Sequence, residues 1–382
     1  MIIDSDQHLV EHSGLWEEHV DPADRDDALR LTDDEVGNTW ITWRDRRLGI
    51  AEVQTPGDTA TIGARHQRVR RGEPPEQRYD DALPADHHDP AARRARVRAM
   101  GFDAAMLFPN FGLLWERRLA SSPRALRANM RAWNRWCAIV AAEGDGALHP
   151  VAHLSLNDLD WLDTELAALS AAGVRAAMIA PALVDGRPLS HPDLDRAWHA
   201  FVDHGITPVF HVADQPRPFD DGWYTDPDDS FVPVLDSVFL WTAAALASTD
   251  LIVNGVLERH PDLRIGIVEL SAVWVPMYLM MLDGGVHFTT QLNGRPLADL
   301  PLPPSEYFLR QVRVSSFSYE LPEHLRGQLG GADVLMACSD FPHSEGTETP
   351  LADYAASGKY GTSPARAPGL FGANAEFLLR LD

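Results

Sequence analysis

The sequence of 382 residues predicts a single α/β domain, a (β/α)8 barrel of parallel strands with a long insertion after the first strand. Three observations predict this fold. Eight short apolar runs alternate with segments of helical pattern, which is typical of βαβ units and a parallel sheet. Acidic residues and histidines follow several of these runs, as functional groups do at the carboxyl-end mouth of a barrel. No glycine-rich phosphate loop follows the first run, which argues against a doubly wound open sheet.

The expected elements follow one another in chain order. The first strand spans residues 1–8, and a polar stretch rich in Asp, Arg and Pro then extends over residues 17–95. Loops longer than about 12 to 15 residues are usually functional, so we expect this insertion, together with residues 214–235, to cover the barrel mouth. The other strands are expected at residues 103–108, 148–156, 174–180, 206–212, 263–270, 312–317 and 333–339. Helices are expected at residues 123–143, 158–172, 192–204, 232–259 and 373–381.

Composition narrows the classes of function. The net charge of −23 argues against nucleic acid or an anionic membrane as a partner, because both require clustered positive charge. The two cysteines form no disulfide framework, no signal-peptide pattern is visible, and no apolar run reaches the roughly 20 residues of a membrane span. We therefore expect a cytoplasmic protein. Lys359 is the only lysine, so any bridge between two metal ions must come from Asp, Glu or water.

The first candidate metal ligands lie at the end of the first expected strand. Asp6 and His8 are two residues apart, so both side chains point to the same face of a strand. Glu11 would reach the same place if the chain turned helically after His8. An ordinary polar loop is the alternative interpretation of this segment.

Four further candidates follow later apolar runs, and each has a structural alternative. His211 could be a satisfied core histidine, and Glu269 could be buried against an arginine, since a buried carboxylate is costly unless it is paired or metal-bound. Asp340 and His343 could form a helix-capping turn. If all these strand ends meet at one mouth, their imidazoles and carboxylates form a mixed nitrogen and oxygen metal site.

Longer motifs give these residues a family context. The motifs are Asp6-Gln7-His8 with Glu11, residues 259–264 (RHPDLR), Glu269 with Trp274-Val275-Pro276, residues 339–346 (SDFPHSEG) and residues 372–375 (GANA). With them the chain resembles the amidohydrolase-related metal-dependent barrel family, which includes aminocarboxymuconate-semialdehyde decarboxylase and related aromatic decarboxylases. The resemblance implies that Asp6, His8, His211 and Asp340 bind a metal. At the sixth strand those decarboxylases carry a histidine acid/base group, whereas this chain has Glu269.

The presence of Glu269, where the decarboxylases carry a histidine, indicates a site for a second metal ion. With Glu11 and His343 nearby, six or seven mixed ligands suit two ferrous or manganous ions better than one catalytic zinc, which normally has three protein ligands. The chain in this respect resembles the non-haem dinuclear iron monooxygenases of the same superfamily, among them a platensimycin-type diterpenoid hydroxylase. The main prediction is therefore a monooxygenase with two Fe ions, or Fe and Mn, that hydroxylates an apolar acyl or carboxylate-bearing small molecule.

Two alternatives stay open. In the first, a single Zn or Mn ion serves a hydrolase or decarboxylase, and Glu269 or His343 moves the proton. These two residues are the predicted catalytic groups. In the second, the barrel is a non-catalytic protein that keeps a closed structural metal site.

Substrate contacts are predicted from aromatic residues at strand ends and mouth loops, for which packing of the cap is the alternative role. They are Trp16, Phe108, Trp115, Trp274 and Phe317. Four arginines of the insertion could hold a carboxylate or phosphate, for example of an acyl thioester, or could form a solvated basic turn. They are Arg65, Arg68, Arg70 and Arg71. The expected partner is a small-molecule substrate. A homodimer, in which a second copy of the chain is a partner, is also compatible with the sequence.

Overall fold

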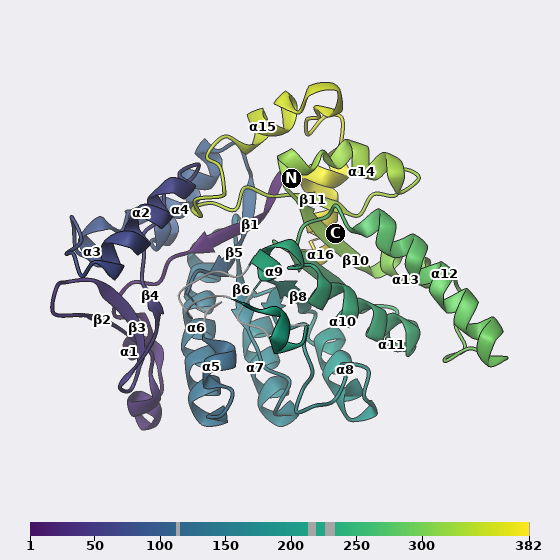
Figure 1. The fold of residues 1–382 in the computed structure, drawn as a ribbon, viewed down its shortest axis with the longest axis horizontal. Helices are drawn as coiled ribbons and strands as arrows, with labels where there is room; N and C mark the ends of the chain where they lie inside the picture. Colours follow the sequence, from purple (N-terminus) through teal and green to yellow (C-terminus); the bar gives the residue numbers. More distant parts are fainter. Residues whose placement is uncertain (112–114, 213–218, 226–233, 382) are drawn as a thin grey trace.

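The computed structural model describes residues 1–111, 115–212, 219–225 and 234–381. Its centre is a barrel of eight parallel strands in the order β1-β5-β6-β7-β8-β9-β10-β11, which confirms the predicted (β/α)8 fold (Figure 1). The strands are β1 (Ile3–Leu9), β5 (Ala104–Pro109), β6 (Leu148–His153), β7 (Ala176–Met178), β8 (Thr207–His211), β9 (Ile265–Val268), β10 (Val312–Ser316) and β11 (Leu335–Ala337). Each lies within or close to an expected run, because a buried parallel strand is a continuous apolar segment.

Helices separate the strands along the chain. Those of the outer layer are α4 (Pro90–Ala99), α6 (Pro123–Glu143), α7 (Leu159–Ala171), α8 (Asp195–Asp203), α10 (Thr242–Val253), α11 (Val256–Arg259), α12 (Val275–Asn293), α13 (Pro304–Gln311), α14 (Pro322–Gln328) and α16 (Asn374–Leu379). Shorter helices lie in the connections: α1 (Leu15–His19), α5 (Glu116–Leu119), α9 (Val234–Val238) and α15 (Pro350–Ala356). No helix in the described part of the chain is long and apolar enough to cross a membrane.

Two helical regions differ from the expectation. Residues 232–259 were expected to form one helix, but the described part of this range, residues 234–259, forms three, α9, α10 and α11. Gly255, with φ 75°, separates α10 from α11 because a left-handed residue cannot continue a helix. Two helices, α12 and α13, occupy the interval between β9 and β10, to which the sequence pattern assigned no element.

The barrel closes where β1 meets β11, the first and last strands. The backbone N–H of Asp340 donates to the carbonyl of Asp6 at 2.9 Å, and the N–H of His8 donates to the carbonyl of Phe341 at 2.7 Å. These two bonds join the carboxyl ends of the two strands, so they bring the polar residues that follow each strand into contact.

The barrel interior has an apolar end and a polar end. Its apolar side chains form a separate cluster that includes Ile3, Met106 and Val209. Leu378 and Leu379 of α16 belong to the same cluster, so the last helix packs against the amino-terminal end of the barrel. At the opposite end, acidic and histidine side chains lie at or just beyond the carboxyl ends of β1, β8, β9 and β11.

The insertion after β1 forms a small antiparallel sheet with helices beside it. The sheet consists of β2 (Arg30–Asp33), β3 (Thr39–Trp43) and β4 (Arg46–Ile50), and the helices are α2 (Thr59–Arg70) and α3 (Tyr79–Ala82). In Figure 1 these elements lie on the left, beyond the carboxyl end of β1. The expected boundary at residue 95 falls inside α4, which leads directly into β5 and is therefore a barrel helix. Of residues 214–235, most lie outside the described residues.

Candidate metal centre

Six candidate ligands converge at the carboxyl ends of four strands. Asp6 and His8 come from β1, His211 from β8, Glu269 follows β9, and Asp340 and His343 follow β11. They form two overlapping groups, in each of which the ligand atoms lie within 4.8 Å of one another. The groups are Asp6, His8, His211 and Glu269, and His8, Glu269, Asp340 and His343.

The distances within the cluster are those of groups arranged around a common point. His8 Nε2 lies 3.2 Å from Asp340 Oδ1 and 3.5 Å from Asp6 Oδ1. His211 Nε2 lies 3.5 Å from Asp6 Oδ1 and 3.3 Å from Glu269 Oε2. The expectation from the spacing of Asp6 and His8, that both face the barrel mouth, agrees with this arrangement.

The ligand atoms of this cluster are buried and have no hydrogen-bond partner. They are both Oδ atoms of Asp6 and of Asp340, Nε2 of His8 and of His211, Oε2 of Glu269 and Nδ1 of His343. Buried polar atoms are normally hydrogen-bonded, and isolated buried carboxylates are costly, so a concentration of such atoms is typical of a cation-binding site. Nitrogen and carboxylate donors together fit a divalent ion such as Zn or Mn.

Hydrogen bonds to the other ring nitrogen set the tautomers of all three histidines. His8 Nδ1 lies 3.1 Å from the carbonyl of Pro109, and His211 Nδ1 lies 2.8 Å from the carbonyl of Val212. A carbonyl only accepts, so each Nδ1 carries the proton and each Nε2 turns its lone pair toward the cluster. By the same reasoning, His343 donates from Nε2 to the Asn110 side-chain oxygen at 2.9 Å and leaves its Nδ1 lone pair free. Such partners fix metal-binding histidines in orientation.

The carboxyl groups of the cluster differ in acidity. Burial raises the pKa of Asp6, but His211 and His8 lower it more, so that it lies well below its usual range. Burial likewise raises the pKa of Asp340, and the adjacent His343 lowers it below the usual range. The pKa of Glu269 is instead raised, first by burial and then by the charge of Asp340. Glu269 is therefore the carboxyl group of this cluster best able to hold a proton.

Two of the acids sit on strained backbone. Glu269 has φ 52° and Asp340 has φ 57°, the left-handed region that residues other than glycine seldom adopt. Each such residue costs about 1 kcal/mol or more and persists only where its surroundings hold it. In both cases the turn lies directly after a strand and directs the carboxylate into the cluster, which is where strained residues usually occur.

Several supporting residues escaped the sequence analysis. Asp4 is fully buried, and its Oδ1 accepts the backbone N–H groups of Asp6 at 3.2 Å and of Ser339 at 3.0 Å. It therefore holds two chain segments that carry candidate ligands. Asn110 orients His343, as described above. Alternation along the strand gives no signal for Asp4, because β1 pairs irregularly with β5 between Asp4 and Gln7. Ile3 lies in the apolar cluster of the barrel interior, and Asp4 Oδ2 accepts a hydrogen bond from the Gln7 side chain at 2.9 Å.

Gly346 supports the turn that carries Asp340, and Glu320 supports the turn that carries Glu269. Gly346 packs so closely under the carbonyl groups of Ser339 and Asp340 that a Cβ atom there would collide with them. Glu320 accepts hydrogen bonds from Ser271 Oγ at 2.6 Å and from two backbone N–H groups, beside the turn after β9. No local sequence signal distinguishes these two residues from ordinary loop positions.

Glu11 does not join the ligand groups, contrary to the prediction. β1 continues to Leu9, and the first helix begins only at Leu15, so the chain makes no helical turn directly after His8. Both carboxylate oxygens of Glu11 accept the backbone N–H of Phe111, at 3.1 and 2.9 Å. Glu11 thus fastens the loop after β5 rather than facing the cluster.

The predicted substrate-contacting aromatic residues have different surroundings. Phe108 lies beside the cluster, with its ring centroid 4.3 Å from that of His211. Trp274 instead packs among the rings of Trp241, Tyr278 and Phe308, and its indole N–H donates to backbone carbonyls. Its predicted role is thereby corrected to packing in the helix layer. Trp16 and Trp115 are buried in the main core, and Phe317 stacks on Tyr319 with 5.0 Å between ring centroids.

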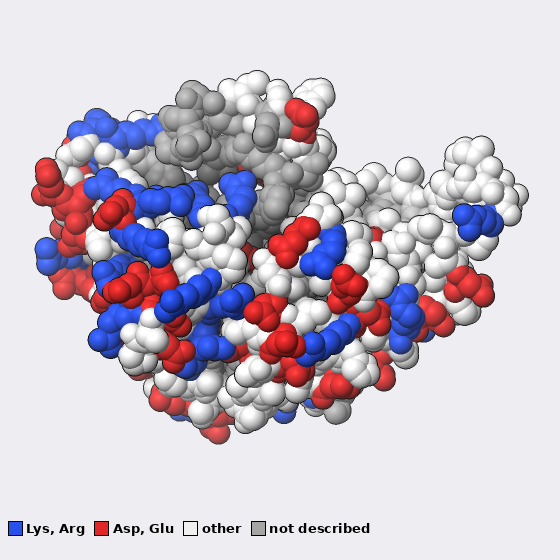
Figure 2. Space-filling model, turned by 90° about the horizontal axis from the view of Figure 1, so that it is seen from below, with Lys and Arg blue, Asp and Glu red and all other residues white. Residues whose placement is uncertain are grey.

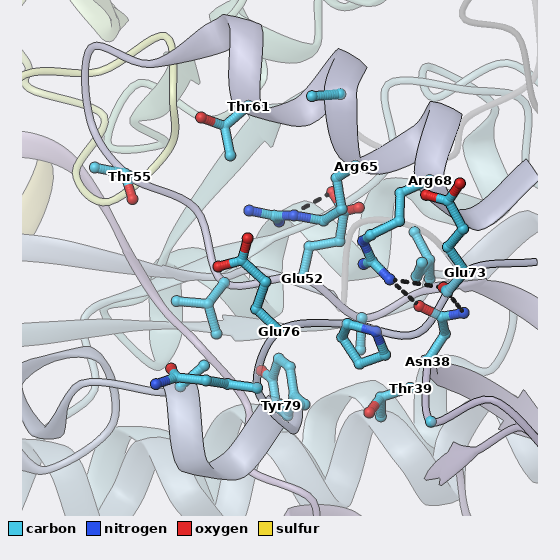
Figure 3. Close-up of a pocket in the computed structure, with 18 of the residues that line it drawn as sticks. Asn38, Thr39, Glu52, Thr55, Thr61, Arg65, Arg68, Glu73, Glu76 and Tyr79 are labelled. Atoms are coloured by element: carbon cyan, nitrogen blue, oxygen red, sulfur yellow. Dashed lines mark hydrogen bonds and ion pairs between the residues drawn. The ribbon is translucent and has the colours of Figure 1, made fainter. Parts of the chain in front are cut away.

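Three of the four insertion arginines line a polar pocket of about 830 Å³ between the small sheet and α2 (Figure 3). Arg65 pairs with Glu52 at 3.4 Å, Arg68 donates to Asn38 at 2.6 Å, and Arg71 pairs with Glu73 at 2.7 Å. Each of these cations thus has a partner within the insertion, and the lining contains as many carboxylates as arginines. The pocket agrees better with the alternative interpretation of a structural basic cluster than with a strongly anion-selective site. Arg70 is not among the lining residues.

Comparison with known proteins identifies the fold. No family model and no curated protein matches the chain. Among solved structures, an amidohydrolase (map2389c) from Mycobacterium avium subsp. paratuberculosis K-10 has a TM-score of 0.76 and 22% identity, over 99% of this chain and 98% of that one. The chain shares the (β/α)8 barrel fold of this structure over nearly the whole length of both chains.

Two other solved structures with the same barrel fold are named as decarboxylases. The 5-carboxyvanillate decarboxylase LigW from Sphingomonas paucimobilis has a TM-score of 0.62 and 15% identity, with coverage of 99% of this chain and 98% of that chain. A dihydroxybenzoic acid decarboxylase from Polaromonas sp. JS666, solved with bound manganese, has a TM-score of 0.60 and 14% identity, with coverage of 100% and 97%. None of these three neighbours is named as an oxygenase, so they lend no support to the predicted monooxygenase.

Proposed function

We propose that this protein is an enzyme that uses one divalent ion, Mn or Zn, to remove a carboxyl group from a small organic acid, or to hydrolyse such a molecule, without O2. The observation that carries this proposal is the convergence of eight buried, unpartnered ligand atoms at the barrel mouth. The decarboxylase names of the structural neighbours, one of them with manganese, favour this reaction class over oxygenation.

Asp6, His8, His211 and Asp340 would hold the ion. They lie at the carboxyl ends of three strands, β1, β8 and β11, and a catalytic ion held there would keep a coordination position for substrate. When bound, a divalent ion supplies positive charge that polarises a carboxylate or carbonyl oxygen of the substrate. Phe108, beside His211, presents an apolar face against which the substrate body can lie.

Glu269 and His343 would serve as the proton-transfer groups. In decarboxylation the bond to the departing CO2 breaks, its electron pair stays on the substrate carbon, and that carbon takes a proton. Glu269 Oε2 faces the cluster, and its raised pKa lets it hold that proton. In hydrolysis the same oxygen would instead accept a proton from the attacking water. His343, held by Asn110, has its Nδ1 atom 2.9 Å from Asp340 Oδ1.

A two-ion monooxygenase is the second candidate. The observation in its favour is the second ligand group, in which His343 Nδ1 lies 2.9 Å from Asp340 Oδ1. Six convergent ligands exceed the three that a single catalytic zinc normally takes from the protein. Against it, His8 belongs to both groups and has only Nε2 to offer, because its Nδ1 faces the carbonyl of Pro109.

Metal content and oxygen dependence together test the proposal. The protein is purified without chelators under anaerobic conditions, and its metal is measured by elemental analysis per chain. It is then assayed with a panel of aromatic and aliphatic carboxylic acids for CO2 release or hydrolysis, with and without O2. One Mn or Zn per chain with oxygen-independent turnover supports the proposal. Two iron ions with turnover that requires O2 would replace it by the second candidate. Full turnover in metal-free protein would overturn both.

A further inference from the structure

Helix α12 presents an apolar face to solvent. Its buried residues Val275, Tyr278, Leu279 and Leu282 pack toward the barrel, and all lie in its first half. The opposite side carries large apolar side chains that are each at least half exposed. We call this side, with the neighbouring Leu297, the α12 face; its members are Met277 (50%), Met280 (73%), Met281 (69%), Phe288 (64%), Leu292 (72%) and Leu297 (76%).

The α12 face groups six large apolar side chains, each at least half exposed, on one side of the molecule. Contiguous apolar patches above a few hundred Å² are rare on monomeric proteins and mark interaction surfaces. Between α10 and α12 the face borders a groove of about 520 Å³, lined mainly by apolar side chains. Figure 1 shows α12 extending away from the barrel, where its own chain does not cover it.

Charge is almost absent from this helix. In a chain with net charge −23, the 19 residues of α12 include one charged residue, Asp283. That carboxylate is turned toward its own molecule, because it accepts hydrogen bonds from the N–H and Oγ of Ser305 at 2.8 and 2.7 Å. In Figure 2 the projecting part on the right is mostly white, whereas the body of the molecule carries many red and blue side chains. Two strongly acidic copies can meet most readily at such an uncharged face.

Two glycines lie in the middle of the exposed stripe. Gly284 and Gly285 stand between Met281 and Phe288, and a Cβ atom at either position would meet nothing within 4 Å. Glycine weakens a helix interior, and nothing in the same chain requires the lack of a side chain there. A second helix crossing α12 at this point would require it, because small residues let two helix backbones approach closely.

We propose that the α12 face is the interface of a homodimer in which the two α12 helices cross antiparallel at Gly284 and Gly285. A two-fold axis at that point pairs each end of the stripe with the opposite end of its copy. Met281 would then face the partner's Phe288, and Met277 the partner's Leu292. The stripe is thus complementary to itself, as an isologous interface requires.

The test measures molar mass by size-exclusion chromatography with light scattering at micromolar protein concentration. Wild-type protein is expected at twice the chain mass of 42.3 kDa. The double variant Met281→Asp/Phe288→Asp is expected at the chain mass, with a dimer dissociation constant raised by about 30-fold or more, as for loss of central contact residues. Leu183→Asp is the matched control: it places a charge on an equally exposed apolar residue (65%) outside the face and is expected to remain dimeric.

A second variant separates the interface from helix stability. Leucine at position 284 should favour the helix of the single chain, where the site is open, but should block a close crossing. Gly284→Leu is therefore expected to weaken the dimer by about tenfold or more without a loss of far-ultraviolet helical signal. Wild-type protein at the mass of one chain, or variants that stay dimeric, would overturn the proposal.

Discussion

His8 Nε2 lies 3.2 Å from Asp340 Oδ1, although His8 belongs to the first strand of the barrel and Asp340 follows the last one. The contact depends on barrel closure, since the backbone of each residue is hydrogen-bonded to the opposite strand. The fold and the metal centre therefore both require closure of the barrel between β1 and β11. A substitution that disturbs this closure should lower both the stability of the fold and the affinity for metal.

Removing the β8 imidazole should abolish tight metal binding. In His211→Ala a ligand is lost that no neighbouring side chain of the same type replaces. The affinity for Mn or Zn should fall by more than the roughly 10- to 100-fold that loss of a supporting residue costs. Elemental analysis after dialysis against a weak chelator measures the effect. His204→Ala, at a surface pair with Asp163, is the control and should retain the ion. Unchanged metal content in His211→Ala would contradict the assigned role of β8.

Glu269→Gln should separate metal binding from turnover. Glutamine keeps the size of the side chain but cannot transfer a proton, so turnover should fall by about 100-fold or more. In the one-ion enzyme the metal content stays at one per chain. A fall from two ions to one would instead support the oxygenase candidate, because it would assign Glu269 to a second ion. Glu306→Gln, an exposed residue of α13, should change neither quantity.

Gly346→Ala should weaken the metal centre through the backbone. The added methyl group would collide with the carbonyl groups of Ser339 and Asp340, which must then shift the turn that presents Asp340. Such overpacking costs about 1 to 3 kcal/mol, measurable in urea denaturation, and should also lower metal affinity. Gly327→Ala in α14, where a Cβ atom meets nothing within 4 Å, should leave both unchanged or slightly raise stability. Full stability in the first variant would show that the turn adapts without cost.

Acid should destabilise the protein in part through His149. Burial lowers the pKa of this histidine to about 4, from a usual value near 6.5. The unfolded chain then binds more protons than the folded one between these two values. Stability from this residue is therefore fully present above about pH 6.5 and is lost as pH falls toward 4.

The size of that loss can be measured by substitution. Between pH 7 and pH 4.5, metal-free wild-type protein should lose about 2 kcal/mol more unfolding free energy than His149→Gln, with allowance for partial exposure. Urea denaturation at the two pH values gives the difference. His199→Gln removes an exposed histidine (68%) and should behave as wild type. Identical losses in wild type and His149→Gln would refute the contribution of His149.

Much of the fold was predictable because the responsible signals are local. A buried parallel strand is a short apolar run, and a long amphipathic helix repeats its apolar positions every three to four residues. The expected helix at residues 123–143 has the same bounds as α6. The spacing of Asp6 and His8 likewise predicted a shared direction for their side chains, because alternation along a strand does not depend on distant residues. Six of the seven residues named as ligands from sequence lie together, because the carboxyl ends of the parallel barrel strands share one mouth.

Other features depend on neighbours that are distant in the sequence. Glu11 was expected at the metal centre, but its carboxylate accepts a hydrogen bond from the backbone N–H of Phe111 instead. The proton positions on His8 and His211 follow from carbonyl groups that only the folded chain brings near.

The sequence by itself determined the barrel, the order of its strands and which polar residues end them, since these follow from periodicity and composition along the chain. The tertiary structure alone decided which of those residues meet, which proton each one holds and which face of α12 stays uncovered. Those outcomes depend on hydrogen bonds and packing between segments far apart in the chain, which local sequence patterns do not predict.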